Sequence, residues 1–348
     1  LGLATPLAVV ISEGVLANNG ILVKKSEVLE NASKIDTIVF DKTGTLTYGK
    51  LKISRIYNYS TMKDEEILKL VGSLESKSMH PIGKAFTEYM KENKMEVEPV
   101  EEFENISGYG IIGRVQNEKI ILGNSKIVSK YNIKNDYMED EKELASNGNS
   151  IIYVIKNERI ISIIGVNDVV RENAKEVIKK LHQKNIKTIM LTGDNKQTAE
   201  KVAEKLEISR VVSNVLPSEK ADLIKKLKKE NKYVMMCGDG INDSPALANS
   251  DIGVSVKSGT DIAMDSSDVI LTKNDLNSIL KLINISERTI RNIKQNLFWA
   301  FFYNSLMIPI AMGVFRFAKI TINPDVASFA MVFSSITVIF NALRLRKK

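Results

Sequence analysis

The feature that most constrains the fold is a repeated local pattern, in which a short apolar run is followed at once by an acidic turn that contains glycine. Three such turns occur, directly after the runs that end at Phe40, Leu191 and Cys237. In an open α/β sheet the ligand site lies at the carboxyl ends of the strands. The three turns are therefore predicted to meet in one crevice.

Strand-like and helix-like runs alternate in this part of the chain. Apolar β-rich runs cover 35–40, 187–191, 233–237 and 252–256, and amphipathic helices are predicted at 172–183, 196–206 and 218–230. Such an alternation predicts a doubly wound, parallel α/β sheet.

Residues 48–165 break this alternation. Strand-like runs occur there at 111–115, 120–122, 151–155 and 160–164, with helices predicted near 64–76 and 82–92. We therefore expect an α+β domain at 48–165, inserted between two parts of the sheet domain at 34–47 and 166–284.

Two long uncharged runs lie near the C-terminus, at 297–315 and 326–343. Each approaches the roughly 20 residues that a helix needs to cross a lipid bilayer. Basic residues flank the pair on one side, so the positive-inside rule predicts two transmembrane helices at 285–348 with that side in the cytoplasm. Residues 1–33 are expected to be the end of an earlier transmembrane helix and a linker. A buried hairpin in a soluble core is the alternative for the two runs.

The acidic turns carry groups suited to phosphoryl chemistry. Asp41, Asp239 and Asp243 would repel one another unless a cation lay between them, and Mg²⁺ prefers such oxygen ligands. Lys220 could supply positive charge to a transferring phosphoryl group. For any single turn, a helix cap or a solvated loop is the alternative interpretation.

Composition narrows the function classes only slightly. The net charge of +7 suits nucleic acid, a phosphorylated ligand or an anionic membrane, and does not choose among them. The motifs point to a phosphorylated ligand, so nucleic acid is not expected as a partner. The single cysteine, Cys237, excludes an internal disulfide and fits a reducing compartment.

The turns also carry a family resemblance. The segments DKTGTLT at 41–47, TGDN at 192–195, PSEK at 217–220 and GDGINDSPAL at 238–247 resemble the phosphorylation domain of P-type ATPases, within the haloacid-dehalogenase superfamily. The resemblance implies that Asp41 accepts the γ-phosphoryl group of ATP as an aspartyl-phosphate. It implies Mg²⁺ binding by Asp41, by the backbone carbonyl of Thr43 and by Asp239. The other implied catalytic residues are Thr192, Gly193, Asp194, Lys220, Asn242 and Asp243.

One position adds a mechanistic expectation. Phosphatases of this superfamily usually carry an aspartate two positions after the nucleophile, as a general acid and base. Thr43 stands there in this chain, and its hydroxyl cannot take up a proton at neutral pH. The phosphoenzyme is therefore expected to persist until a glutamate of a separate actuator domain, which this sequence lacks, activates water.

The insert resembles the nucleotide-binding domain of the heavy-metal branch of this family. His80-Pro81 is similar to the end of its Ser-Glu-His-Pro motif, although Met79 replaces the motif's glutamate, and two glycine turns are also similar. For His80 taken alone, a structural histidine is the alternative. The resemblance implies that the following residues bind ATP: Glu75, His80, Gly108, Gly110, Gly123 and Asn124.

The two C-terminal runs contain polar residues, which are functional by default inside a membrane. Tyr303-Asn304 lies in the first run, and Met331 precedes Ser334 and Ser335 in the second. A thioether is a soft ligand that suits Cu⁺. Both patterns resemble the copper(I)/silver(I) class, which implies Tyr303, Asn304, Met331 and Ser334 as ligands of transported Cu⁺ or Ag⁺. The alternative is that Met331 packs and the serines bond to helix backbone.

The opening LGLATP at 1–6 resembles the segment that directly follows a Cys-Pro-Cys-Ala metal site in this family. We therefore expect the C-terminal fragment of a copper(I)-transporting P-type ATPase, an integral, multi-pass protein of a bacterial cell membrane with cytoplasmic catalytic domains. Its expected partners are ATP, the copper ion, the lipid bilayer, a copper chaperone and the missing N-terminal part with its actuator domain and Cys-Pro-Cys helix. The alternatives are a soluble phosphohydrolase of the same superfamily and a non-catalytic nucleotide-binding module.

Overall fold

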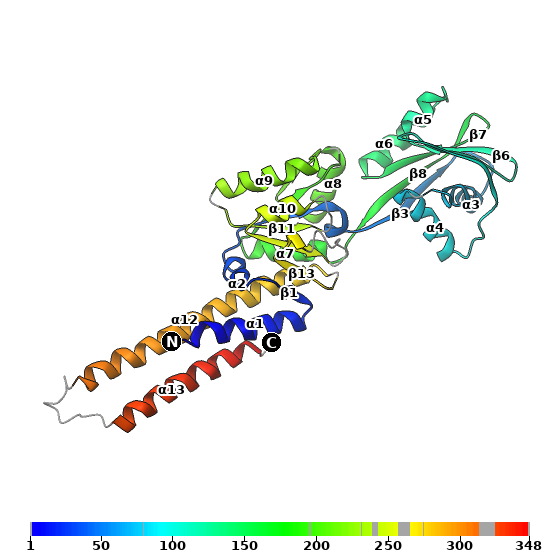
Figure 1. Cartoon of the computed structure of the whole chain (residues 1–348). Helices are drawn as coiled ribbons and strands as arrows, with labels where there is room; N and C mark the ends of the chain where they lie inside the picture. The colour runs from blue at the N-terminus through cyan, green and yellow to red at the C-terminus, as the bar shows by residue number, and fades with distance from the viewer. Residues whose placement is uncertain are drawn as a thin grey trace. The chain divides into compact units, whose positions relative to one another are not determined.

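The structure, a computed structural model, describes residues 2–78, 80–194, 196–230, 232–238, 243–256, 265–273, 275–312 and 324–346. These residues form two β-sheets with their helices and a group of long helices (Figure 1). The chain divides into two compact units, one of residues 1–41, 175–189 and 216–348, and the other of residues 42–174 and 190–215.

The first sheet contains, in the described part of the chain, seven strands in the order β1-β13-β12-β11-β2-β9-β10. Their bounds are β1 (Ile21–Val23), β2 (Thr37–Asp41), β9 (Lys187–Leu191), β10 (Arg210–Val212), β11 (Val234–Gly238), β12 (Ile252–Val256) and β13 (Val269–Leu271). β11 pairs in parallel with β2 and β12, and β12 pairs in parallel with β13, whereas β1 pairs antiparallel at the edge. Every residue of β2, β11 and β12 is buried, as is typical of parallel strands covered on both faces. The expected parallel α/β sheet is confirmed.

Five helices alternate with the strands of the first sheet along the described chain. They are α2 (Glu27–Ala32), α7 (Ala174–Gln183), α8 (Lys196–Leu206), α9 (Pro217–Lys229) and α10 (Ser244–Asn249). Proline suits the first position of a helix, where no backbone N–H is needed, and α9 begins at Pro217. The side chain of Glu219 accepts a 2.9 Å hydrogen bond from the backbone N–H of Leu216, which fixes the start of this helix. Lys220 is thereby placed in the first turn of α9.

The second sheet contains, within the described residues, six antiparallel strands in the order β3-β8-β7-β6-β5-β4. Their bounds are β3 (Thr47–Asn58), β4 (Val100–Ile106), β5 (Gly110–Val115), β6 (Glu118–Gly123), β7 (Ser150–Lys156) and β8 (Arg159–Val170). Side chains of α3 (Asp64–Glu75) and α4 (Pro81–Glu92) form one buried core with this sheet. A second core includes side chains of α5 (Ser125–Lys130) and α6 (Met138–Ser146).

Three further helices, α1 (Ala4–Asn18), α12 (Asn277–Ala311) and α13 (Pro324–Leu343), run side by side (Figure 1). Buried polar side chains join them. The hydroxyls of Ser12 and Thr289 lie 2.6 Å apart, and the side-chain amide of Asn296 donates to the backbone carbonyl of Ala4 at 3.3 Å. Asn341 of α13 donates to the side-chain oxygen of Asn296 at 2.8 Å. These bonds fix the register of the three helices.

The two predicted C-terminal helices are therefore present, but a crossing of the bilayer is not shown. Within the described ranges, no helix combines the length and apolar character that a membrane span needs. The physical reason on α12 is that its apolar part begins only at Leu297, after charged residues up to Lys294 and the polar pair Gln295-Asn296. The described residues of this stretch end at Met312. The predicted run continued to Phe315, which lies outside the described residues.

Candidate active site and nucleotide pocket

Asp41 is the last residue of β2, and its side chain is buried. The ammonium group of Lys220 donates a 2.5 Å hydrogen bond to Oδ1 of Asp41 and a 2.7 Å hydrogen bond to Oδ1 of Asp243. Lys220 and Asp243 both come from segments far away from Asp41 in the sequence. The structure thus joins three of the predicted catalytic residues in one buried charge cluster.

The charges in this cluster stabilise one another. Burial lowers the pKa of Lys220, but the two carboxylates of Asp41 and Asp243 raise it more, so the pKa lies above its ordinary value. Lys220 is therefore a permanent cation at neutral pH. It holds two carboxylates together that would otherwise repel each other.

A glycine allows this close approach. Gly238 ends β11, and a Cβ atom at this position would lie 2.6 Å from Oδ2 of Asp243. Any side chain there would displace the carboxylate that Lys220 binds. Asp239 and Asn242, two further predicted site residues, lie outside the described residues.

The loop that follows Asp41 is held by its own hydrogen bonds. The hydroxyl oxygen of Thr47 accepts from the backbone N–H of Gly44 at 3.0 Å and lies 3.0 Å from the carbonyl oxygen of Lys42. Gly44 has φ of +73°, a left-handed conformation that costs glycine little. Thr43, whose carbonyl is a predicted Mg²⁺ ligand, is extended, with φ of −73° and ψ of 128°.

Sequence reasoning missed two residues that hold this loop. The buried guanidinium of Arg171 donates to the carbonyls of Thr45 and Gly44, each at 2.6 Å. Asp168, near the end of β8, accepts from the hydroxyl of Thr47 at 2.5 Å and from the backbone N–H of Lys50 at 3.1 Å. Burial raises the pKa of Asp168, against the hydrogen bond from Thr47. The signal that was available is the pair of charges at the end of an otherwise apolar run.

The second predicted turn has its own contacts. The ammonium group of Lys42 lies 2.5 Å from Oδ2 of Asp194, and the backbone N–H of Asp194 donates to the hydroxyl of Thr192 at 3.1 Å. Gly193 lies between them. Among the described residues, a Cβ atom added at Gly193 would have one atom within 4 Å, the carbonyl oxygen of Val215 at 3.7 Å. Its backbone is therefore accessible to a ligand.

The described donors fit Mg²⁺ in kind. The carboxylate of Asp41 and the carbonyl of Thr43 are hard oxygen donors, which this ion prefers. Within the described ranges no group of three or more His, Cys, Asp or Glu residues gathers at a metal site, and the third predicted ligand, Asp239, lies outside them. Lys220 supplies the cation that balances Asp41 and Asp243.

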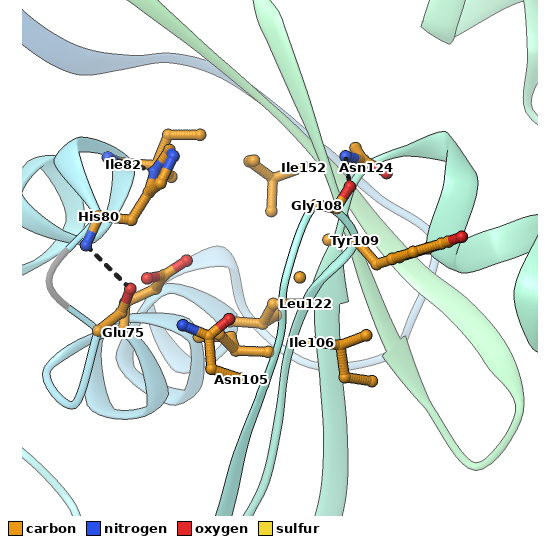
Figure 2. A pocket seen from close by; sticks show the side chains of 14 residues that line it. Glu75, His80, Ile82, Asn105, Ile106, Gly108, Tyr109, Leu122, Asn124 and Ile152 are labelled. Carbon is orange, nitrogen blue, oxygen red and sulfur yellow. Dashed lines mark hydrogen bonds between the residues drawn. The ribbon is translucent and has the colours of Figure 1, made fainter.

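A cavity of about 190 Å³ opens in the second sheet's domain, between α3, the start of α4 and the turns that join β4, β5, β6 and α5 (Figure 2). All of the residues predicted to bind nucleotide line it: Glu75, His80, Gly108, Gly110, Gly123 and Asn124. Sites for whole drug-sized ligands have volumes of roughly 300–1,000 Å³. This cavity is therefore of a size for the base of a nucleotide, with the remainder outside.

Glu75 is the buried acid of this cavity. It ends α3, is only 6% exposed, and its Oε2 atom has no hydrogen-bond partner among the described residues. Burial raises the pKa of Glu75 to about 7, although a hydrogen bond from Ser78 opposes the shift. A Cβ at Gly83 would lie 2.8 Å from Oε2, so the glycine makes room for this carboxyl group.

His80 lies at the start of α4, on the same side of the cavity as Glu75 (Figure 2). Its Nδ1 atom accepts a 3.3 Å hydrogen bond from the backbone N–H of Ile82 and so caps the helix. The ring therefore has a structural role in addition to lining the cavity. With Nδ1 as acceptor, the proton of the neutral ring is on Nε2.

The glycine turns form the opposite side. A Cβ at Gly110 would collide with the backbone of Leu122, and one at Gly123 would collide with the carbonyl of Tyr109. Asn124 ties the two turns together, because its side-chain amide donates to the carbonyl of Gly108 at 3.0 Å (Figure 2). Close backbone packing thus shapes this side of the cavity.

The predicted copper ligands lie on the two neighbouring C-terminal helices. Tyr303 and Asn304 lie on α12, where the amide of Asn304 donates to the carbonyl of Ala300 at 2.9 Å. Met331 and Ser334 lie on α13. Ser334 is half-buried, whereas the side chain of Met331 lies outside the description.

The comparisons with known proteins agree with this geometry. The haloacid dehalogenase-like hydrolase family matches residues 35–251. A solved structure described as the catalytic domain of the CPx-ATPase CopB-B is 33% identical and has a TM-score of 0.62, and the match covers 78% of this chain and 98% of that one. The chain belongs to the heavy-metal P-type ATPases, within the haloacid dehalogenase-like hydrolases.

Other members of the P-type ATPases match the whole chain. A copper-exporting P-type ATPase of Legionella pneumophila is 39% identical over 100% of this chain and 47% of its own length, and a probable copper-importing P-type ATPase of Enterococcus hirae is 40% identical over the same shares. A zinc-transporting PIB-type ATPase, solved in an E2·Pi state, is 29% identical with a TM-score of 0.88, over 99% of this chain and 55% of that one. The chain thus spans about half the length of the relatives it matches.

Proposed function

We propose that this chain is the catalytic, C-terminal portion of a copper(I)-transporting P-type ATPase, which hydrolyses ATP through phosphorylated Asp41. The observation that carries the proposal is the buried contact of Asp41 with Lys220, at the carboxyl end of a central parallel strand. A nucleophilic carboxylate beside a fixed cation is what phosphoryl transfer requires. The copper-transporting relatives support the choice of ion.

In the proposed reaction, a carboxylate oxygen of Asp41 attacks the γ-phosphorus of ATP. The new bond joins this oxygen to phosphorus, the bond to the β–γ bridging oxygen breaks, and its electron pair leaves with ADP. Lys220 stabilises the negative charge of the transferring group, and Asp243 fixes Lys220 in place. When bound, Mg²⁺ would be held by Asp41, the carbonyl of Thr43 and Asp239, and would neutralise phosphate charge. The turn of Thr192, Gly193 and Asp194 would bind phosphoryl oxygens, with Asn242 supporting the site.

The domain at 48–165 would hold the adenine end of ATP in the cavity lined by Glu75 and His80. A carboxylate oxygen without a partner is suited to accept a hydrogen bond from the amino group of adenine. The close-packed turns at Gly110 and Gly123 would admit the nucleotide against backbone. Residues 34–47 and 166–284 would form the phosphorylation domain.

The helices α12 and α13 would lie in the membrane, with the catalytic domains in the cytoplasm. Most of the large apolar side chains that are exposed in the described chain lie on the outer parts of these helices, namely Phe298, Trp299, Phe301, Phe302, Ile308, Met312, Val332, Phe333, Ile336, Ile339, Phe340 and Leu343. Exposed apolar surface of this extent marks a protein or membrane contact. Tyr303, Asn304, Met331 and Ser334 would then bind Cu⁺. Relatives named for export and for import match alike, and a copper chaperone stays a prediction.

Phosphorylation with γ-labelled ATP and Mg²⁺, followed by an acid quench, tests the proposal. We expect an acid-stable label that hydroxylamine removes and that Asp41→Asn lacks. Asp222→Asn is the matched control, because Asp222 lies on α9 near Lys220 but is exposed, and it should label like the parent protein. A label that persists in Asp41→Asn would overturn the proposed nucleophile.

The ion is tested separately, in a longer protein that includes the N-terminal part. Met331→Ala and Asn304→Ala should lower the number of Cu⁺ ions bound or their affinity, without loss of labelling at Asp41 from phosphate. Unchanged copper binding in both variants would remove these residues from the proposed ion site.

A further inference from the structure

Asn105 is a polar residue of the nucleotide cavity that the sequence motifs do not include. It lies near the end of β4, the last strand of the second sheet in the described chain, directly opposite Ile111 of β5. Residues directly opposite in an antiparallel pair project from the same face of the sheet, and Ile111 belongs to the core formed with α3 and α4. The side chain of Asn105 therefore lies on the face where these helices place Glu75 and His80.

The amide group of Asn105 is directed into the cavity, towards the carboxyl group of Glu75 (Figure 2). Its side chain is exposed, and its amide group bonds to no residue that the structure describes. Oε2 of Glu75 likewise has no partner among the described residues. The two side chains therefore offer unused hydrogen-bonding groups to the same part of the cavity.

Two other polar side chains of the lining already bond to the protein itself. Asn124 uses both its amide nitrogen and its amide oxygen in hydrogen bonds to backbone. The hydroxyl of Ser78 accepts a 3.2 Å hydrogen bond from the backbone N–H of His80. These groups shape the cavity, whereas the amide of Asn105 stays available to a ligand.

The chemistry of an uncommitted carboxamide beside an uncommitted carboxylate fits one edge of adenine. The amino group of adenine has two N–H bonds, and ring nitrogens that accept hydrogen bonds lie on both sides of it. A carboxylate can accept from one N–H. A carboxamide can accept from the other and donate to the neighbouring ring nitrogen, which is how asparagine recognises adenine in DNA. Hypoxanthine has an oxygen in place of the amino group, so it would leave both acceptors without a donor.

We propose that Asn105 is a specificity-determining residue for the base, whose amide binds the amino group and a neighbouring ring nitrogen of adenine. Glu75 accepts the second hydrogen of the same amino group. The inference rests on the proposed function, in which this cavity holds the adenine end of ATP. It assigns the choice of adenine over other purines to a side chain of the last strand of the sheet.

Titration calorimetry of the whole chain with ATP and with ITP tests the proposal. ITP carries hypoxanthine in place of adenine, and titration without Mg²⁺ measures binding apart from phosphorylation. At pH 8, above the pKa of Glu75 of about 7, the parent chain should bind ATP at least about tenfold more tightly than ITP. Asn105→Ala should lower the ATP affinity at least about fivefold and the ITP affinity less, so that the preference for ATP shrinks.

A second variant and a control separate hydrogen bonding from packing. Asn105→Leu keeps roughly the size of the side chain without its polar atoms, and it should reduce the preference for ATP as Asn105→Ala does. Ser107→Ala removes an exposed hydroxyl two residues along the chain that does not line the cavity, and it should keep both affinities. Because Asn105 is exposed, the Tm of each variant should stay close to that of the parent.

Several results would overturn the role of Asn105. An unchanged preference in Asn105→Ala, with a parent chain that prefers ATP, would remove this residue and leave the nucleotide cavity in place. Equal losses for ATP and ITP would show a contact with the sugar or the phosphates, and a retained preference in Asn105→Leu would show that only volume matters. A parent chain that binds ATP and ITP alike would also overturn the adenine contact of Glu75, whereas labelling of Asp41 tests the nucleophile independently.

Discussion

Nη2 of Arg171 donates a 2.6 Å hydrogen bond to the carbonyl of Gly44, three residues after Asp41, the proposed nucleophile. Nε of the same side chain bonds to the carbonyl of Thr45, and the backbone N–H of Arg171 donates to the carbonyl of Leu46 at 3.0 Å. A buried guanidinium with fixed donors can hold a loop in one conformation. The loop that carries Thr43 is therefore positioned from the end of β8.

Arg171→Gln tests this positioning role. The variant leaves buried carbonyls with fewer donors, so we expect the free energy of unfolding to fall by about 2–3 kcal/mol and phosphoenzyme to fall at least tenfold. Urea unfolding and labelling with γ-labelled ATP measure the two effects, and Arg171→Lys should recover only part of the labelling. Arg55→Gln, which removes an exposed ion pair with Glu143, is the control. Normal labelling of Arg171→Gln would contradict the role.

Lys220→Met should lower the free energy of unfolding more than the loss of an exposed ion pair does. The change leaves Asp41 and Asp243 facing each other in a buried site, and breaking a buried pair costs about 3–5 kcal/mol. In the parent chain the stabilisation is present until the pH rises through the raised pKa of Lys220, beyond the neutral range. In the variant, protonation of the carboxylates should relieve the repulsion, so its stability should recover as the pH falls.

Thermal unfolding of Lys220→Met between pH 5 and pH 8 checks this expectation. The double variant Lys220→Met/Asp243→Ala should regain part of the lost stability, because one of the opposed carboxylates is gone. Neither variant should form phosphoenzyme. A Lys220→Met protein as stable as the parent at pH 8 would show that the cluster is not a structural element.

Glu75→Gln should change the pH dependence of stability. The pKa of Glu75 is about 7 in the folded chain and 4.5 ordinarily, because burial favours the protonated carboxyl group. The protonated group therefore contributes its full share to the free energy of unfolding below pH 4.5, and this contribution is lost as the pH rises through 7. The difference between the two pKa values corresponds to about 3 kcal/mol of the free energy of unfolding. Glutamine does not ionise, so the variant should not lose this free energy at high pH. The variant should therefore gain stability relative to the parent at pH 8 and not at pH 4.5, as urea unfolding can measure.

The same variant separates stability from binding. If the ionised carboxylate of Glu75 accepts a hydrogen bond from the amino group of adenine, the ATP affinity of the parent should rise as the pH rises through 7. The ATP affinity of Glu75→Gln should not change with pH over the same range. Titration calorimetry at pH 6 and pH 8 compares the two, with Glu92→Gln on the exposed surface as control. Identical pH profiles in parent and variant would exclude this contact.

Two glycines of the cavity provide a matched pair. In Gly123→Ala the new Cβ atom would clash with the carbonyl oxygen of Tyr109. In Gly108→Ala the new Cβ atom would meet no described atom within 4 Å, and the only strain would come from the φ of +78°. We expect Gly108→Ala to cost about 1 kcal/mol and Gly123→Ala clearly more, with a larger loss of ATP affinity. Equal effects on stability would argue against the close packing of the two turns.

The sequence predicted buried elements well and exposed ones poorly. The bounds of β9, β12 and α8 agree with the predicted ranges, because an apolar run or an apolar helical face marks each of them. β3 was missed, since most of its residues before Tyr57 are exposed or only partly buried and lysines and an arginine interrupt its apolar pattern. Its place depends on its pairing with β8, which no local pattern records.

The candidate site shows the same limit. Asp41, Lys220 and Asp243 could be found because each lies in a recognisable motif at the end of a strand or the start of a helix. For Asp168 and Arg171 the local signal is only a pair of charges at the end of an apolar run. Their partners are set by the register in which β8 pairs with β3, with Asp168 opposite Leu51. A side chain that acts through another segment's backbone leaves little local signal.

The helix α12 extends without a break from Asn277 to Ala311. Its first turns are anchored among buried residues, including Ile279, Leu282 and Ile283, and its far part carries Tyr303 and Asn304. At 1.5 Å per residue it is about 50 Å long, so a tilt of about 5° at the anchored end displaces the other end by roughly 4–5 Å. If α12 moves as a rigid body, a small rotation of its first turns therefore becomes a displacement several times larger at Tyr303 and Asn304.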